Sequence, residues 1–247
     1  MTDPLQLPAD HDPANPLLGA WSAPHETPPF AAIRPEHFRP AFDHAMAAHM
    51  AEIEAIAAAP EGASFANTIE ALERSGRVLD RVSAVFSALA GAHTNDALMA
   101  IEREMSPLLA AHRNRIHLHD RLYARIKALW DRRGELDLSP EQARVLERYD
   151  VTFRRAGAGL PAAAKSRIAA IGERLAALGT AFSQNVLADE QAYALVLEGE
   201  DDLAGLSEGA RAAAHLLREL QRPPRQERAN VGYSEMKKML WGAHKYR

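Results

Sequence analysis

The chain has 247 residues, of which 47% are hydrophobic and 25% charged, and this size and balance are ordinary for a soluble globular protein of one large domain or two small ones. It has no cysteine, which excludes disulfides and thiolate metal sites, and its net charge of −4 gives no indication of nucleic-acid binding. No run of about 18 apolar residues could span a membrane, and the acidic start of the chain does not resemble a secretory signal. We therefore expect a cytoplasmic protein.

Residues 1–34 are rich in proline and have few periodic apolar positions. We predict an extended arm that lies over a surface and is anchored by Leu17, Leu18, Trp21 and Phe30. The first helix is predicted from about residue 35 to residue 59, with Pro40 tolerated in its first turn. Its apolar stripe consists of Phe38, Phe42, Met46, Met50, Ile53 and Ile56.

Four more helices are predicted before residue 160. Asn67, three residues before Glu70, is similar to a capping box and starts the second helix, which contains Gly76. A turn at residues 94–96 starts the third helix, in which we expect a kink at Pro107. Asp120 is expected to cap the fourth helix, and Ser139-Pro140-Glu141-Gln142 gives the clearest helix start in the chain. The fifth helix should stop at the glycines of residues 157 and 159.

A long helix is predicted over residues 161–187, because its apolar residues recur in steps of three and four. The fold predicted is all-α: an elongated multi-helix bundle with this long helix at its centre and at most one short strand, over residues 192–197. Ser207 can cap a last helix, which Pro223 must stop. We divide the chain into an arm (1–34), a helical lobe (35–221) and a basic tail (222–247). From residue 215 to the end the net charge is +5, against −9 for the rest.

No catalytic, cofactor-binding or metal-binding residue is predicted. The pairs His44/His49 and His112/His117 are each spaced by five, whereas a zinc pair on a helix needs a spacing of four, so surface or helix-end positions are favoured for these histidines. The sequence has no glycine-flanked catalytic serine and no glycine-rich phosphate loop. The remaining pairs of ionisable residues are typical of a solvated surface or give only a weak metal signal: His117/His119, His25/Glu26, Glu102/Glu104 and Asp201/Asp202.

Several short motifs, taken in order, resemble the N-terminal region of one family. They are Asn15-Pro16-Leu17-Leu18, Ile33–Phe38, Phe65–Glu73 with Ser75-Gly76, Thr94-Asn95, Glu104–Leu109 and Phe182–Leu187. Over roughly residues 15–214 the chain is similar to the thimet-oligopeptidase family of zinc metallopeptidases, in its peptidyl-dipeptidase Dcp and oligopeptidase A branch.

The resemblance implies an almost all-helical body around a channel that admits short peptides. It also implies a zinc ion held by an HExxH helix and a downstream glutamate. This sequence has no HExxH, so we expect no zinc in this chain. We interpret it as a non-catalytic N-terminal lobe whose partners are short peptides and the missing catalytic lobe, with self-association through exposed apolar surface. The alternatives are a stand-alone helical interaction module and an enzyme with an unrecognised site.

Overall fold

The structure is a computed structural model that describes residues 14–193 and 203–213. In these two ranges it is helical and contains no strand, so the all-α fold class is confirmed. The chain divides into two units, residues 1–182 and 183–247, and each is described by itself. None of the helices described is both long and apolar enough to cross a membrane.

The arm begins with a buried turn that the sequence itself encodes. The Asn15 side chain accepts a hydrogen bond from the backbone of Leu17 and donates one to the carbonyl of His37, at 3.0 and 2.9 Å. This turn places Leu17 and Leu18, both almost fully buried, against the first helix. Trp21 is partly buried and stacks with the guanidinium of Arg81, whereas Phe30 is 46% exposed, so it is not the predicted anchor.

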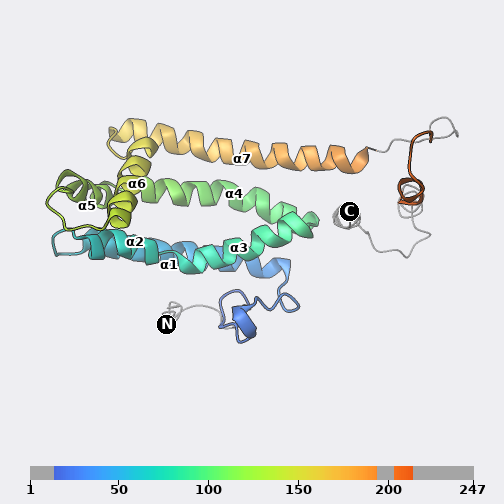
Figure 1. Cartoon of the computed structure of the whole chain (residues 1–247), viewed down its shortest axis with the longest axis horizontal. Coiled ribbons are helices and arrows are strands. Elements are labelled where there is room, and N and C mark those ends of the chain that lie inside the picture. The colour runs from blue at the N-terminus through green and yellow to red at the C-terminus, as the bar shows by residue number, and fades with distance from the viewer. Residues whose placement is uncertain (1–13, 194–202, 214–247) are drawn as a thin grey trace. The chain divides into compact units, whose positions relative to one another are not determined.

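Three long helices form the first core of the unit (Figure 1). They are α1 (Phe38–Ala58), which follows a 3₁₀ turn at Pro35–His37, α3 (Arg77–Ala92) and α4 (Asp96–His117). Phe86 of α3 makes edge-on ring contacts with Phe38 and Phe42 of α1, at centroid distances of 5.0 and 5.5 Å. Asn95 caps α4 as predicted, by accepting from Leu98. A single helix, α4, runs through Pro107.

The second predicted helix is divided into three parts. A π-helical turn at Phe65–Glu70 leads into α2 (Ala71–Arg74), and α3 begins only after Ser75 and Gly76. Ser64 is the N-terminal cap, bonded reciprocally with Asn67, so the capping box lies three residues earlier than predicted. Gly76 has a φ of 76°, a left-handed conformation that interrupts a helix and that glycine adopts most readily.

The second core joins the far half of α1 to α5 (Asp120–Asp131) and α6 (Pro140–Ala156), which lie together in Figure 1. Leu122, Ile126 and Leu129 of α5 are fully buried. The cap of α5 is His119 rather than Asp120, because the ring nitrogen of His119 accepts from Leu122 at 3.1 Å. The start at Ser139 and the stop at Gly157, with a φ of 98°, are as predicted for α6.

The long helix exists as α7 (Ala162–Ala192), but no residue of it is buried. It does not lie at the centre of the bundle. Within the first unit it lies along α4 (Figure 1) and is held there by polar contacts, among them a bond from Asn114 to the Ala169 carbonyl. The prediction of a core helix, based on the periodic stripe, is therefore wrong for this element.

In the second unit, Ser207 caps a helical segment at residues 208–213 by accepting from Ala210 at 3.2 Å. Ala192, the first residue of the predicted strand, is the last residue of α7. The rest of that strand beyond Tyr193, and the basic tail, lie outside the described residues. The three-part division of the chain stays a prediction.

Candidate functional site

A cavity of about 650 Å³ lies among α1, α3, α4, α6 and α7 in the first unit. Apolar side chains form part of its lining, including Ile53, Leu79 and Met105. The polar part consists of hydroxyl and ionisable groups contributed by several helices: His49, Ser75, Asp80, Ser83, Ser87, Glu102, Ser106, His112, Arg113, His117, Tyr149 and Thr180. A cavity of this size and mixed lining is the principal candidate for a binding site.

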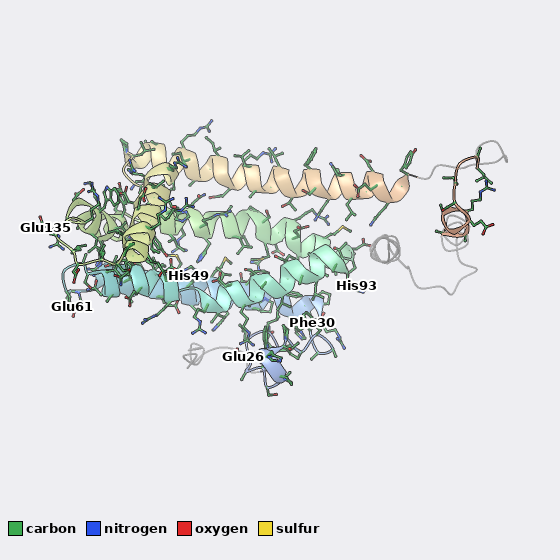
Figure 2. The ribbon with its side chains drawn as sticks, in the orientation of Figure 1. Glu26, Phe30, His49, Glu61, His93 and Glu135 are labelled. Carbon is green, nitrogen blue, oxygen red and sulfur yellow. The ribbon has the colours of Figure 1, made fainter. Side chains whose placement is uncertain are left out.

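The polar lining includes a pair of histidines from helices far apart in the sequence. Nε2 of His112 on α4 lies 3.0 Å from Nδ1 of His49 on α1, and the ring centroids are 5.0 Å apart. His112 is buried, whereas the sequence favoured a surface or helix-end position. Figure 2 labels His49. The two imidazoles thus join α1 to α4 inside the unit.

The neighbouring Ser75 determines the direction of the hydrogen bonds. Its hydroxyl donates to the Leu72 carbonyl at 2.8 Å, so towards Nε2 of His49, 3.4 Å away, it is an acceptor. With the proton of His49 on Nε2, Nδ1 of the same ring accepts from His112. Each hydrogen bond in the row from His112 through His49 and Ser75 to the Leu72 carbonyl then has one donor and one acceptor, and both imidazole rings are neutral.

Gly76 makes room for this arrangement. A Cβ atom at position 76 would lie 2.8 Å from Cε1 and 3.0 Å from Nδ1 of His49, closer than van der Waals contact allows. The backbone N–H of Gly76 also donates to Glu52 at 2.7 Å. The break between α2 and α3 is therefore the point at which α1 and its histidine approach the backbone.

Burial keeps the pair neutral. It lowers the pKa of His112 to about 4, with smaller contributions from His49 and Arg115. Burial also lowers the pKa of His49, against the opposing charges of Glu52 and Asp80. At the edge of the cavity, burial and a 2.7 Å bond to Glu73 raise the pKa of Tyr149. Near pH 7 these three side chains carry no charge.

The Ser75–His49–His112 row has the order of a catalytic triad but not its chemistry. In a triad a carboxylate faces Nδ1 of the histidine and stabilises the imidazolium that forms when the serine loses its proton. Here a second histidine occupies that place, and a positive charge on His49 would be unfavourable beside it. The Ser75 proton is directed to the Leu72 carbonyl, away from His49. The row can hold the helices together but cannot activate a nucleophile in this way.

The same residues do not fit a zinc ion. Zinc in proteins is held by at least three protein ligands. Among residues 14–193 and 203–213, no three histidine or carboxylate side chains gather in a way that could hold a metal. The facing nitrogens of His49 and His112 are bonded to each other. We therefore derive no step through a metal at this site.

The other ionisable pairs of the sequence are separated or have structural roles. His117 packs edge-on against Phe153 at 5.2 Å, whereas His119 caps α5. Glu102 lines the cavity, and Glu104 is paired with Arg39. His25 and Glu26 lie in the 3₁₀ turn Pro24–Glu26 of the arm. Asp201 and Asp202 lie outside the described residues. No spacing signal in the sequence indicates the His49–His112 pair, because 63 residues separate its members.

Curated proteins similar to this chain are bacterial peptidases. The dipeptidyl carboxypeptidase of Escherichia coli (strain K12) is 41% identical over 194 residues, and that of Salmonella typhimurium (strain LT2) is 40% identical over 206 residues. The alignments cover 78% and 83% of this chain but 28% and 30% of those proteins. Oligopeptidase A of Salmonella typhimurium is 32% identical over 81% of this chain and 29% of its own length. No family model matches the sequence.

The fold and these similarities define an all-helical relative of bacterial peptidases. More specifically, the chain is homologous to the dipeptidyl carboxypeptidases and oligopeptidases A, and the resemblance to the thimet-oligopeptidase family is confirmed. It spans about 30% of the length of the relatives that it matches.

Proposed function

We propose that this chain forms the N-terminal, non-catalytic lobe of a peptidase of the dipeptidyl carboxypeptidase and oligopeptidase A type. The observation that carries the proposal is the alignment itself, which covers about four fifths of this chain and under a third of the relatives. A helical unit with its own two cores supports it, because such a unit can fold as one lobe of a larger protein.

In this proposal the lobe forms one wall of a channel that admits short peptides. In this proposal the groups that bind zinc and activate water lie in the part of the relatives outside the match, in keeping with the HExxH motif that the family resemblance implies and this sequence lacks. The lobe limits the size of the substrate and carries no step of the hydrolysis. We further propose that the protein acts in the cytoplasm.

The first test asks whether the chain hydrolyses peptides by itself. The purified 247-residue protein is analysed for zinc and assayed with a quenched peptide, with and without a chelator, beside the Escherichia coli dipeptidyl carboxypeptidase. We expect cleavage by the complete enzyme alone. Stoichiometric zinc together with chelator-sensitive cleavage by this chain would contradict a non-catalytic lobe.

The second test supplies the rest of the enzyme. The dipeptidyl carboxypeptidase of Escherichia coli is expressed without the 194 residues that align here, and this chain is added in trans. We expect peptide cleavage from the mixture and from neither part alone. A mixture as inactive as its parts, with the truncated enzyme shown to be folded and zinc-loaded, would contradict the proposal.

A stand-alone helical module that binds peptides or a partner protein is the second candidate. The cavity of about 650 Å³, with hydroxyl and apolar lining, favours it because it is present without any further chain. The trans assay distinguishes the two candidates. A lobe restores peptide cleavage to the truncated enzyme, whereas a stand-alone module binds a peptide by itself and restores no activity.

A further inference from the structure

Helix α7 makes several hydrogen bonds to the rest of the first unit through its small and polar residues. Thr180 donates to Ser106 at 2.8 Å, and Ser106 donates to the Ala176 carbonyl at 3.2 Å. Near the start of the helix, Lys165 donates to the Leu118 carbonyl at 3.2 Å and pairs with Asp120. These residues recur along one side of α7, and their hydrogen bonds to Ser106 and Asn114 make it the side that faces α4, which runs alongside α7 in Figure 1.

The large apolar residues of α7 lie on another side. Ile171, Leu175, Leu178 and Phe182, which we call the α7 stripe, are exposed by 42, 62, 47 and 70%. Their spacing of four, three and four residues puts them on one helical face, about two fifths of a turn from the residues that contact α4. Polar residues thus hold the helix while its most hydrophobic face is left in water, and a contiguous apolar face of this kind is typical of an interface.

The charges at the two ends of the stripe are opposite. Exposed Arg167 lies four residues before Ile171, and exposed Asp189 lies seven residues after Phe182, both close to the face of the stripe on the same helix. Leu178 is the midpoint of residues 167 and 189. When two such helices pair in opposite directions about Leu178, each Arg167 lies opposite the Asp189 of the other copy. Parallel pairing would instead bring like charges together.

We propose that the α7 stripe is the interface for a second copy of this chain, with the two α7 helices antiparallel and crossing at Leu178. Leu175 of each copy then packs near Phe182 of the other, in the manner of a short antiparallel coiled coil. The inference rests on exposure and charge pattern in α7 and does not depend on the proposed peptidase function.

The first experiment measures the oligomeric state of the full chain by analytical ultracentrifugation over a range of concentrations. We expect a dimer, and we expect Leu175→Glu to raise its dissociation constant at least 100-fold, because the new carboxylate would be buried in the interface. Ala170→Glu adds the same charge to an exposed position of α7 away from the stripe and should leave the constant within about twofold. Circular dichroism checks that both variants remain helical.

The second experiment tests the charge pattern. Arg167→Glu places like charges at both ends of the dimer and should raise the dissociation constant about tenfold. Asp189→Lys should do the same, whereas the double variant restores opposite charges and should return the constant to within about threefold of the starting value. Such a rescue is not expected of independent structural effects, since residues 22 positions apart on one helix do not meet.

The third experiment tests the direction of pairing and uses the absence of cysteine from the chain. Under oxidation Leu178→Cys should form a covalent dimer. Ile171→Cys should not, because in the antiparallel arrangement its neighbour is near residue 185. A mixture of Leu175→Cys and Phe182→Cys should yield the mixed dimer.

Several results would overturn the proposal. They are a monomer at all concentrations, a dimer unaffected by Leu175→Glu, and efficient cross-linking of Ile171→Cys to itself. A stripe that binds only the truncated peptidase, and never a second copy, would overturn it as well. Because the trans assay of the peptidase function is separate, either proposal can fail while the other holds.

Discussion

Gly76 shows at the scale of one residue how a backbone position determines a contact between helices. It precedes α3 with a φ of 76°, directly after α2 has ended, and its missing side chain leaves room for the ring of His49. A sequence that reads as one helix through position 76 is therefore interrupted there, and the interruption is where Ser75 contacts the histidine pair.

We predict that Gly76→Ala destabilises the protein by about 2–3 kcal/mol, because alanine is strained in the left-handed region and its Cβ would force His49 to move. Gly91→Ala is a matched control. Gly91 lies in α3 with nothing near its would-be Cβ, so the change should stabilise by about 0.5–1 kcal/mol. Urea unfolding followed by circular dichroism measures both, and effects of the same sign would contradict this account.

The histidine pair predicts a loss of stability in mild acid. The unfolded chain protonates its histidines below pH of about 6.5, whereas burial lowers the pKa of His112 to about 4 and lowers that of His49. The stabilising contribution is therefore complete above pH of about 6.5 and is lost as the pH falls towards 4. Because the pair is only partly shielded from solvent, we expect a loss of about 1 kcal/mol between pH 7.5 and 5.

The measurement is the urea midpoint at pH 7.5 and at pH 5 for two variants. His112→Asn should remove much of the pH dependence, whatever it does to the stability at pH 7.5. His93→Asn, at the exposed end of α3 (Figure 2), should leave it unchanged. A pH dependence that is equal in the two variants would assign the effect to other groups.

At the scale of the element, local signals in the sequence were sufficient for most helix positions. Helix ends depend on contacts within about four residues, so the sequence alone can indicate them. Examples are the caps at Asn95 and Ser139 and the helix stop at Gly157. The predicted stripe of α1 is buried apart from Met46, which is partly buried, since a periodic apolar face and an available partner coincide there.

Two features could not be inferred from local pattern. The apolar stripe of α7 predicts a buried helix, yet no residue of α7 is buried and its hydrogen bonds to α4 are made by small and polar residues. Periodicity carries no information about which side finds a partner. The histidine pair depends on α1 and α4 packing side by side, which brings together residues 49 and 112. Predicting both features requires long-range contacts rather than spacing.

At the scale of the whole first unit, α1 belongs to both hydrophobic cores. Its first half packs with Leu17, α3 and α4, and its second half packs with α5 and α6. A continuous 21-residue helix that contributes to both cores should transmit a loss of packing from one to the other. We therefore expect the two cores to unfold together rather than as separate domains.

The cooperativity can be tested because each core has its own tryptophan, Trp21 beside the first and Trp130 beside the second. Leu129 is fully buried in the second core, so Leu129→Ala should destabilise that core by about 3 kcal/mol. Trp241 and one of the two reporters are replaced by phenylalanine, and urea unfolding is followed by fluorescence of the remaining tryptophan. The Trp21 transition should move as far as the Trp130 transition, since α1 cannot lose one core and keep the other.

Phe42→Ala, in the first core, is the reciprocal change and should move the Trp130 transition equally. If Leu129→Ala moved only the Trp130 transition, α1 would not couple the cores, and each would have to be treated as an independent folding unit.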